Sequence, residues 1–295
     1  MQGGLERTVH PVRRLLLLVA AFLLPGAAAF FACTRADETP AGPADLPPEP
    51  EIRVSGSETA FPVLERLIQV YTGENPRARV RILPGTSTAG GVAGVRSGAL
   101  DLGTCSRPLR RDETAGLAYH LLGYDPIAFA VHPAGGAPKL GAETVREIYG
   151  GSIRNWAQVD GVDHEILPLD RRPDQSVRRA LMEGFFGPGF QMSEAAVVLD
   201  RPADMTRALA TTPYTIGYAG RAELRSLGLE VRTVPPGGRW PRPDEVRSGT
   251  FRLVIPLGVV SRPSPRPEVA RFLAFLTGSR AAAVLDALGA VPAAP

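Results

Sequence analysis

Three short segments of the chain concentrate glycine, serine and threonine directly after a predicted strand. They are SGSETAFP (55–62), LPGTSTAGG (83–91) and GTCSRPL (103–109). Where a helix begins, unpaired N–H groups and the positive end of the helix dipole attract anions, and hydroxyl groups add donors without charge. The same residues are ordinary caps and turns, so one segment alone indicates capping. Three of them at the carboxyl ends of parallel strands favour one shared anion site.

A fourth segment, DRRPDQSVRR (170–179), places four arginines around one serine, between a predicted strand and a predicted helix. A guanidinium group offers a planar pair of donors that matches two oxygens of an oxyanion. Arginine is also a common surface residue, and only the position between strand and helix marks Arg172 as a candidate anion ligand.

Catalytic and metal-binding motifs are missing from the sequence. His120, His132 and His164 lie apart, and no carboxylate or cysteine stands at metal-ligand spacing from them. The patterns GxSxG and HExxH and a phosphate-binding P-loop do not occur. Asp101, on a predicted strand ahead of a turn, is expected to pair locally. We therefore expect a binding protein and no enzyme, without cofactor or metal.

The pattern of apolar residues predicts the scaffold that must bring these segments together. Strands at 52–55, 78–83 and 100–104 alternate with a helix that opens near Pro62 and a short helix at 89–98, an order typical of a parallel sheet with crossover helices. Downstream we predict strands at 124–132, 165–170, 216–219 and 251–260, and helices at 142–150 and around 177–185, 269–276 and 284–288.

The final strand and helices need a sheet to join, and the sheet that begins at Ile52 can take them. We therefore predict an α/β protein of two lobes, with mainly parallel sheets and flanking helices. Lobe 1 comprises residues 51–131 plus 241–295, and lobe 2, residues 132–240, is inserted between them. Two such lobes leave a cleft between them that closes about a hinge.

Charge and cysteine content narrow the function further. The formal net charge is +3, and most of it lies in the first 33 residues, so the remainder is near neutral and carries no electrostatic footprint for nucleic acid. The two cysteines, Cys33 and Cys105, allow at most one disulfide. Lipidation of Cys33 would forbid that bond and leave Cys105 as a small buried residue with a free thiol.

The first 33 residues have the pattern of an export signal. Three arginines precede the apolar run Leu15–Leu24, and small residues follow. FFAC, which ends at Cys33, resembles the lipobox of bacterial lipoproteins. We predict a signal peptide over 1–32 and a lipid-anchored Cys33 with a proline-rich linker over 33–50. An ordinary secretory signal cut near Ala29 is the alternative, and twin-arginine export lacks the residues that should follow the arginine pair.

The order of the motifs resembles one known family. GSETAFP, GTSTAGGVAGVRSGALDLGTCSRPL, YDPIAFAV, LGAETVREIYGGSIRNW and RPDQS occur in the order and spacing of PstS-type phosphate-binding proteins, the substrate-binding subunits of phosphate ABC importers. The resemblance covers residues 51–183 and continues more weakly to LGAVP. It implies a type II periplasmic binding fold that closes on a dehydrated phosphate and delivers it to an ABC permease. We expect an exported monomer in the periplasm or cell envelope, held at a membrane by its lipid.

The resemblance also implies which residues contact the ligand. The first turn would contribute Thr59 and the backbone N–H of Ala60, with Ser57 beside them. The remaining turns and the inserted lobe complete the predicted ligand set, which is Ser57, Thr59, Ala60, Thr88, Ser106, Arg107, Arg172 and Ser176.

Two departures from the family pattern bear on the ligand. The family's S-G-T-R appears here as Ser176, Val177, Arg178 and Arg179, so that Val177 narrows the approach to the backbone and Arg178 either adds charge to the pocket or faces solvent. An aspartate that accepts the proton of monohydrogen phosphate in some members is Ser106 here. Two alternatives to an importer therefore stay open, an envelope sensor or interaction protein with a weakened anion site and, with less support, a phosphate-ester hydrolase.

Overall fold

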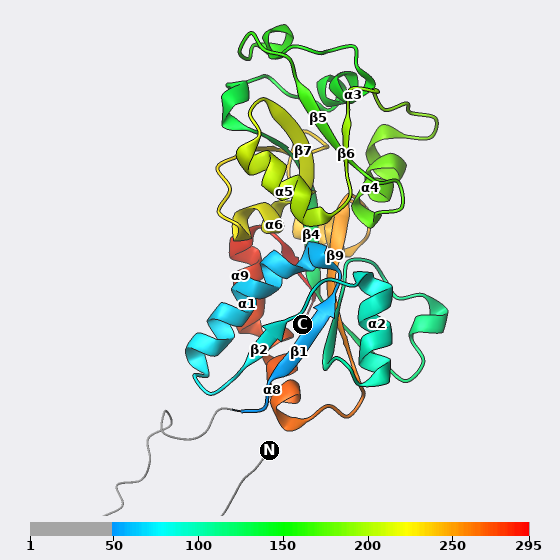
Figure 1. Ribbon diagram of the computed structural model, residues 1–295, viewed down its shortest axis with the longest axis vertical. Coiled ribbons are helices and arrows are strands. Elements are labelled where there is room, and N and C mark those ends of the chain that lie inside the picture. The colour runs from blue at the N-terminus through cyan, green and yellow to red at the C-terminus, as the bar shows by residue number, and fades with distance from the viewer. Residues whose placement is uncertain (1–48, 295) are drawn as a thin grey trace, which may run out of the picture. The chain divides into compact units, whose positions relative to one another are not determined.

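The computed structural model describes residues 49–294 of the chain (Figure 1). The predicted signal peptide, Cys33 and nearly all of the predicted linker lie outside these residues. Within residues 49–294 no helix combines the length and the apolar character needed to cross a membrane.

Short strands and helices alternate along the described residues, as the apolar pattern predicts. The strands are β1 (Ile52–Gly56), β2 (Val80–Ile82), β3 (Leu102–Cys105), β4 (Ala118–Val131), β5 (Leu167–Arg171), β6 (Val197–Leu199), β7 (Thr215–Gly220), β8 (Arg232–Val234), β9 (Val254–Ser261) and β10 (Val291–Pro292). The helices are α1 (Phe61–Glu74), α2 (Ser87–Ser97), α3 (Ala142–Gly150), α4 (Ser176–Leu181), α5 (Pro202–Thr211), α6 (Arg221–Ser226), α7 (Pro243–Arg247), α8 (Pro267–Leu276) and α9 (Ser279–Leu288).

Strand pairing follows one path, in the order β2-β1-β3-β9-β4-β7-β5-β6. At one end β1 pairs in parallel with β2 and β3, and at the other end β5 pairs in parallel with β6 and β7. In the middle, β9 is antiparallel to both β3 and β4, and β7 is antiparallel to β4. The prediction of mainly parallel sheets is therefore wrong for the centre of the molecule. The chain leaves along β4 and returns along β9, and a strand that returns beside the outgoing one must run in the opposite direction.

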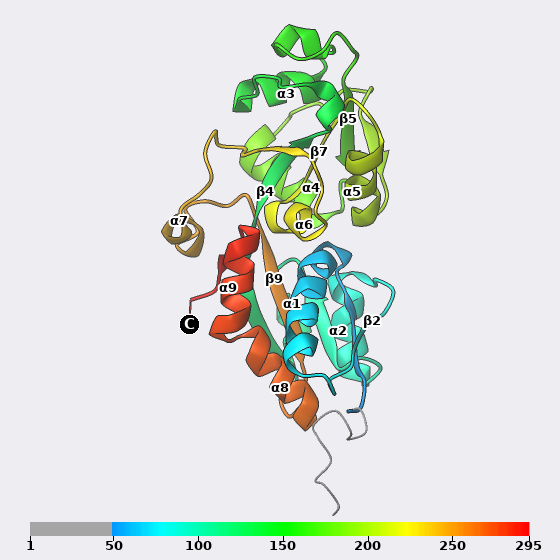
Figure 2. The same ribbon diagram turned by 90° about the vertical axis from the view of Figure 1, so that its left-hand side faces the viewer.

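The long strands β4 and β9 join two parts of the molecule (Figures 1 and 2). We call the part with β1, β2, β3, α1, α2, α8 and α9 the first region, and the part with β5, β6, β7, α3, α4 and α5 the second region. Strand β4 spans 14 residues, and the predicted strand at 124–132 corresponds to its second half. The predicted division of the chain at 131 and 240 stays a prediction.

Helices cover both faces of the sheet in the first region. Leu102 and Val259 point to the side that packs against α1, α8 and α9, whereas Cys105 and Val260 pack with the buried residues of α2. Alternate residues of a strand face opposite sides, which explains this division. On α2, Gly91 lies so close to Gly56 that a Cβ atom at Gly91 would come within 2.9 Å of the Gly56 Cα. Glycine therefore lets α2 pack directly on the strands that carry the donor turns.

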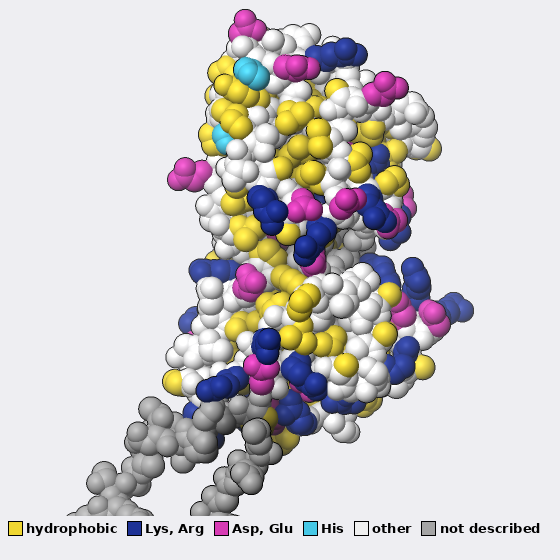
Figure 3. Space-filling model, viewed as in Figure 1, with side chains coloured by type: hydrophobic (Ala, Val, Ile, Leu, Met, Phe, Trp, Pro, Cys, Tyr) yellow, Lys and Arg dark blue, Asp and Glu magenta, His cyan; other side chains and the backbone are white. Residues whose placement is uncertain are grey.

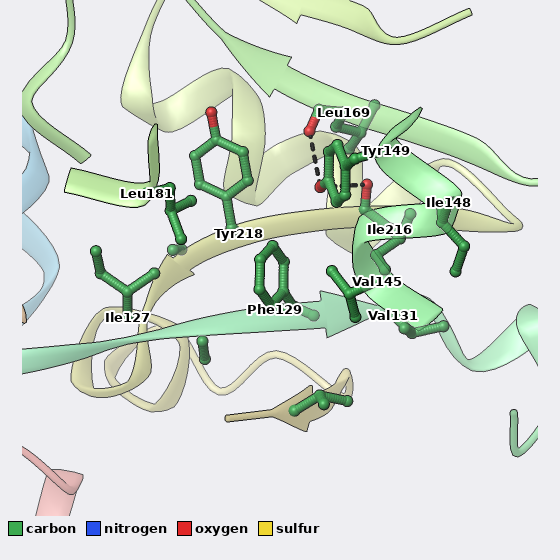
Figure 4. Close-up of a cluster of buried hydrophobic side chains, with 14 of the residues drawn as sticks. Ile127, Phe129, Val131, Val145, Ile148, Tyr149, Leu169, Leu181, Ile216 and Tyr218 are labelled. Atoms are coloured by element: carbon green, nitrogen blue, oxygen red, sulfur yellow. Dashed lines mark hydrogen bonds between the residues drawn. The ribbon is translucent and has the colours of Figure 1, made fainter. Parts of the chain in front are cut away.

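An aromatic core fills the second region (Figure 4). Phe129 packs against both Tyr149 and Tyr218, with ring centroids 5.8 Å and 6.4 Å away. The Tyr149 hydroxyl donates to the backbone oxygens of Leu169 at 3.0 Å and Ile216 at 3.4 Å, so its polar end is satisfied although the ring is buried. This packing holds β5 and β7 against β4.

Several elements were not predicted, and all but the ten-residue helix α5 are short. Strands β6, β8 and β10 have three or fewer residues, and β6 is largely exposed. The helix α6 has six residues, and both oxygens of the buried Asp125 side chain accept hydrogen bonds at its start, from the N–H groups of Ala222 and Glu223. Such helices depend on contacts with residues far away in the sequence, which periodicity alone does not reveal.

Candidate functional site

A cleft with a volume of about 520 Å³ lies between the first and second regions. It is walled by the turns after β1 and β3, the start of α2, the end of β5 and the starts of α4 and α5. Basic side chains lie on both sides of the hollow between the regions, with acidic side chains among them (Figure 3), and those that line the cleft are arginines. Seven of the eight predicted ligand residues line the cleft: Ser57, Thr59, Thr88, Ser106, Arg107, Arg172 and Ser176.

Four hydroxyl groups meet in the cleft although they come from distant parts of the chain. The Ser57 hydroxyl donates to Ser106 Oγ at 2.7 Å, and Ser106 Oγ lies 3.3 Å from Ser176 Oγ. The backbone N–H of Ser106 donates to Thr88 Oγ1 at 3.3 Å. Ser57, Thr88 and Ser106 are nearly buried, and Ser176 is half-buried. The Ser106–Ser176 contact joins the first region to the second.

The second donor turn has a strained backbone. Ser87, the first residue of α2, has φ of 66°, in the left-handed region that non-glycine residues seldom occupy. Ser87 lines the cleft beside Thr88. The helix α2 thus begins directly after a sharp turn, and the first residues of the helix face the cleft.

Ala60 behaves differently from the rest of the predicted set. It is buried in the short 3₁₀ helix after β1 and does not line the cleft. Its N–H group donates to the backbone oxygen of Ser57 at 3.2 Å. The predicted backbone donor is therefore already engaged within its own turn, whereas its neighbour Thr59 does line the cleft.

Arg107 lines the cleft, but its charge is neutralised. Two of its guanidinium nitrogens donate to the two carboxylate oxygens of Glu113, each at 2.7 Å. The Arg107 guanidinium lowers the pKa of Glu113 to about 2. A paired, partly buried guanidinium has few donors left for a ligand.

Arg172 stands just past the end of β5, and its side chain is 52% exposed. Its Nε and Nη2 donate to the two oxygens of Asp174 at 3.1 Å and 3.0 Å. This side-on pair holds the guanidinium in place and leaves Nη1 free of protein partners among the described residues. Arg172 therefore keeps donors that an anion in the cleft can use.

Its neighbour Arg171 has no role in the predicted set, yet it lines the cleft from within the protein. Arg171 is only 1% exposed, and its Nε and Nη2 have no hydrogen-bond partner in the described part of the chain. The guanidinium carbon lies 5.9 Å from the centre of the Tyr218 ring. Arg171 attracts the buried Glu223 carboxylate, and this attraction works against burial, which raises the pKa of Glu223. The charge of Arg171 is therefore balanced in part, whereas its Nε and Nη2 have no acceptor within residues 49–294. The sequence offers one signal for Arg171 as a cleft residue, which is its position at the end of a strand whose carboxyl end faces the cleft.

Arg178, one of the residues that depart from the family's S-G-T-R pattern, was predicted either to add charge to the pocket or to face solvent. The structure shows neither arrangement. Arg178 is 7% exposed, and its Nε lies 2.7 Å from the Asp170 carboxylate, which also accepts a hydrogen bond from the Tyr218 hydroxyl at 2.6 Å. Arg178 therefore neither adds charge to the cleft nor faces solvent. Val177 is 1% exposed and packs in the core of the second region, away from the cleft lining. Val177 and Arg178, the two changed residues of this segment, are thus both buried in the second region.

An ion pair links the two regions at the edge of the cleft. Arg201, directly before α5, places Nη2 at 2.7 Å from the Oε1 of Glu58, which follows β1. Both residues line the cleft. The pair is well exposed on the arginine side, so its strength depends on salt.

Cys105 and Asp101 have structural roles. Cys105 is a free, fully buried cysteine, as predicted, and burial raises the pKa of its thiol to about 12. Asp101 is buried and contacts Arg53 at 3.3 Å and Arg266 at 3.1 Å. Its partners come from distant segments, whereas a local partner was expected.

Comparison with known proteins identifies relatives over most of the chain. A family model described as the PBP superfamily domain matches residues 36–280. The phosphate-binding protein PstS of Bacillus subtilis is 28% identical over 69% of this chain and 68% of its own length. The phosphate-binding protein PstS of Borreliella burgdorferi is 22% identical over 81% of this chain and 88% of its own.

A solved structure has the same fold. It is a candidate phosphate ABC transporter substrate-binding protein from Clostridium perfringens, with bound phosphate. It is 21% identical, covers 83% of this chain and 100% of its own, and superposes with a TM-score of 0.66. At this identity the likeness shows the fold, and it confirms the predicted α/β fold of the type II periplasmic binding proteins.

Proposed function

Because the chain belongs to the PBP superfamily, we propose that it is an extracytoplasmic binding protein that captures inorganic phosphate, or a similar oxyanion, in the cleft and delivers it to an ABC permease. The observation that carries the proposal is the meeting of the Ser57, Thr88, Ser106 and Ser176 hydroxyls in a cleft walled by arginine. The names of the curated relatives, phosphate-binding proteins, support it.

Binding would link the two regions through the ligand. Ser106 and Ser176 already approach to 3.3 Å, and an oxyanion that accepts hydrogen bonds from both replaces this weak contact with two stronger ones. Arg172 supplies N–H donors at the surface of the cleft, and the buried Arg171 adds positive charge behind it. Ligand capture therefore favours the arrangement in which the regions stay together.

The cleft has little means to recognise the proton of monohydrogen phosphate. Two carboxylates in its lining, Glu58 and Asp174, are each engaged with an arginine, and Asp200 is exposed. A serine, Ser106, stands where some phosphate-binding relatives would have an aspartate. We therefore expect weaker discrimination between phosphate and sulfate than a carboxylate in the third turn would give.

The two alternative functions lose support from the described residues. A weakened site in an envelope sensor was suggested by Val177 and Arg178, and both side chains belong to the core of the second region. A hydrolase needs a nucleophile with a base or a metal site, and none of the described residues forms a His, Cys, Asp and Glu cluster suited to a metal ion. His120 and Ser261 are hydrogen-bonded at 3.0 Å, but neither lines the cleft. We propose a binding role without catalysis.

We also propose that the protein is an exported monomer whose lipid-modified Cys33 holds it at a membrane. This proposal depends on residues 1–50, most of which lie outside the described part of the chain. Labelling with radioactive palmitate in a bacterial host should mark the wild type and leave Cys33→Ala unmarked. Equal labelling of both proteins would point to an ordinary secretory signal.

Ligand titration tests the binding proposal directly. At a ligand concentration of about 100 times Kd, binding should stabilise the protein by about 2.7 kcal/mol, which raises the melting temperature by about 5–10 °C for a chain of this size. Phosphate, arsenate, sulfate, molybdate and tungstate are compared by thermal unfolding and isothermal titration calorimetry. If none of these anions changes the melting curve or gives a binding heat, the proposed function is wrong.

A further inference from the structure

A second cavity of about 560 Å³ adjoins the cleft. The two cavities share four lining residues, Ser106, Arg107, Ser176 and Arg179. The Ser106–Ser176 hydroxyl contact at 3.3 Å is therefore part of the wall between them. An anion held by these two serines would lie next to the second cavity as well as inside the cleft.

The second cavity carries excess positive charge, because three arginines without a carboxylate partner in the described chain outnumber the single acidic residue of its lining, the exposed Glu183. Arg179 and Arg247 donate to backbone oxygens, those of Asp174 at 3.1 Å and Pro292 at 3.2 Å, and neither has a carboxylate partner among the described residues. The side chain of Arg252, also in the lining, has no hydrogen bond or ion pair within residues 49–294. Half of the arginines that line the cleft, in contrast, are paired with acids within the described residues, as Arg107–Glu113, Arg172–Asp174 and Arg201–Glu58.

The rest of the lining is largely apolar. It includes Tyr124, Val246, Phe251, Val254 and Pro256, of which Val246 is buried and the others are half-buried. A small inorganic anion gains nothing from such a surface, whereas a carbon skeleton gains about 25 cal/mol for each Å² of apolar surface that it buries. Apolar walls with a few charged groups are typical of sites for organic ligands.

We propose that the second cavity is a subsite for the organic part of a phosphate monoester that carries a second anionic group. Three phosphoryl oxygens would bind the serine hydroxyls and Arg172 in the cleft, and the ester oxygen would pass between Ser106 and Ser176. The carbon skeleton would lie on the apolar residues, and the second anionic group would pair with Arg252 and Arg247. This inference rests on the proposed function, since it assumes that the cleft binds the phosphoryl group.

Three probes separate the parts of this inference: inorganic phosphate for the cleft, phenyl phosphate for the apolar surface, and 4-carboxyphenyl phosphate for the arginines. We expect 4-carboxyphenyl phosphate to bind the full-length protein about tenfold more tightly than phenyl phosphate, since one charge-assisted hydrogen bond supplies roughly that factor. Arg252→Gln should remove this advantage and leave the affinity for inorganic phosphate within about twofold of wild type.

Arg252 is a suitable position because its side chain has no partner to lose among the described residues, so the variant should fold as the wild type does. Arg207→Gln serves as the control, since Arg207 is also exposed and lies outside the lining of both cavities, and its exposed pair with Asp204 contributes little to stability. Dissociation constants come from isothermal titration calorimetry at one ionic strength.

The outcomes distinguish the inference from the proposed function. If phosphate binds but the carboxylated ester binds no better than phenyl phosphate, or if its affinity is the same in Arg252→Gln, the inference is wrong and the phosphate site stands. Another outcome is that the carboxylated ester binds in a manner that depends on Arg252 while phosphate does not bind measurably. This result would support the proposed subsite and overturn the proposed transport of inorganic phosphate. Failure of all three probes to bind would overturn both.

Discussion

The two walls of the cleft offer an anion different chemistry. The wall from the first region presents the hydroxyls of Ser57, Thr88 and Ser106, and its Arg107 is bound by Glu113. The wall from the second region presents a guanidinium with free donors at Arg172 and a buried one behind it at Arg171. Neutral donors on one wall orient the oxygens of the ligand, and the arginines on the other supply the charge. This difference shows that ion pairing with acidic residues, more than residue type, decides which charged side chains are available to a ligand.

The largest effect is expected at Arg178, an arginine of the second region that should stabilise the fold without binding the ligand. Arg178→Thr should lower the free energy of unfolding by about 3–5 kcal/mol, because it leaves the buried Asp170 carboxylate without its cation. Phosphate affinity should stay within about twofold of wild type, since Arg178 does not line the cleft. Urea unfolding and calorimetry measure the two quantities.

A second substitution keeps this test informative if Arg178→Thr folds poorly. The double variant Asp170→Asn with Arg178→Thr removes both charges and should recover part of the lost stability, because no buried charge is left unpaired. A loss of phosphate affinity in the folded double variant would show that Arg178 serves the cleft after all.

The next largest effect concerns the charged wall itself. Arg172→Ala should weaken phosphate binding about 100-fold, because hydrogen bonds from a charged donor contribute about 1.5–3 kcal/mol. Arg171→Gln should have a smaller effect, since its nitrogens are buried and act on the anion through the field alone. Calorimetric titration of both variants measures the difference. A larger loss at Arg171 than at Arg172 would reverse the roles assigned to these neighbours.

A smaller effect is expected on the neutral wall. Ser106→Ala should weaken phosphate binding about tenfold, because it removes one uncharged donor and leaves Ser57 and Ser176 without a shared partner. Thr72→Ala, a hydroxyl deletion on the exposed end of α1, is the matched control and should leave affinity unchanged. If Ser106→Ala costs as much affinity as Arg172→Ala, the two walls contribute equally and the comparison fails.

The smallest effect tests why Arg107 is not available to the ligand. The pKa of Glu113 is lowered to about 2 in the folded protein, so its ionised form stabilises the fold above the ordinary pKa, and this stabilisation disappears as the pH falls through about 2. Glu113→Gln should therefore lower the free energy of unfolding by about 1–2 kcal/mol at pH 7, and the difference from wild type should shrink below pH 4. Urea unfolding at pH 7, 4 and 2.5 measures it, and a difference that does not depend on pH would contradict the assigned ion pair.

Much of the scaffold could be predicted from local patterns. The stripe of Leu64, Leu67 and Tyr71 forms the buried face of α1, and Gly98 ends α2 with φ of 81°, as its place after an apolar stretch predicts. These features depend on residues within a turn or two of each other. The antiparallel centre of the sheet was not predicted, because the direction in which β9 returns beside β4 is a contact between residues far apart in the chain.

The candidate site was predicted in part for the same reason. Donor turns are local, and Ser57, Thr88, Ser106 and Ser176 all lie in the cleft. The role of Ala60 stays a prediction, and its N–H closes its own 3₁₀ turn, a bond that the sequence does not distinguish from a free donor. Arg107 could not be judged, since its neutralisation depends on how the chain turns back to Glu113.

The sequence by itself determined the donor turns, the alternation of strands and helices and the resemblance to the phosphate-binding family, because each is written in neighbouring residues. Only the tertiary structure decided the roles of the four arginines in DRRPDQSVRR. Arg171 ends a buried strand, Arg172 turns outward to Asp174, Arg178 turns inward to Asp170, and Arg179 lies exposed between the two cavities. Four side chains of one type differ in function because burial and the nearest acid, set by the fold, determine which guanidinium keeps free donors.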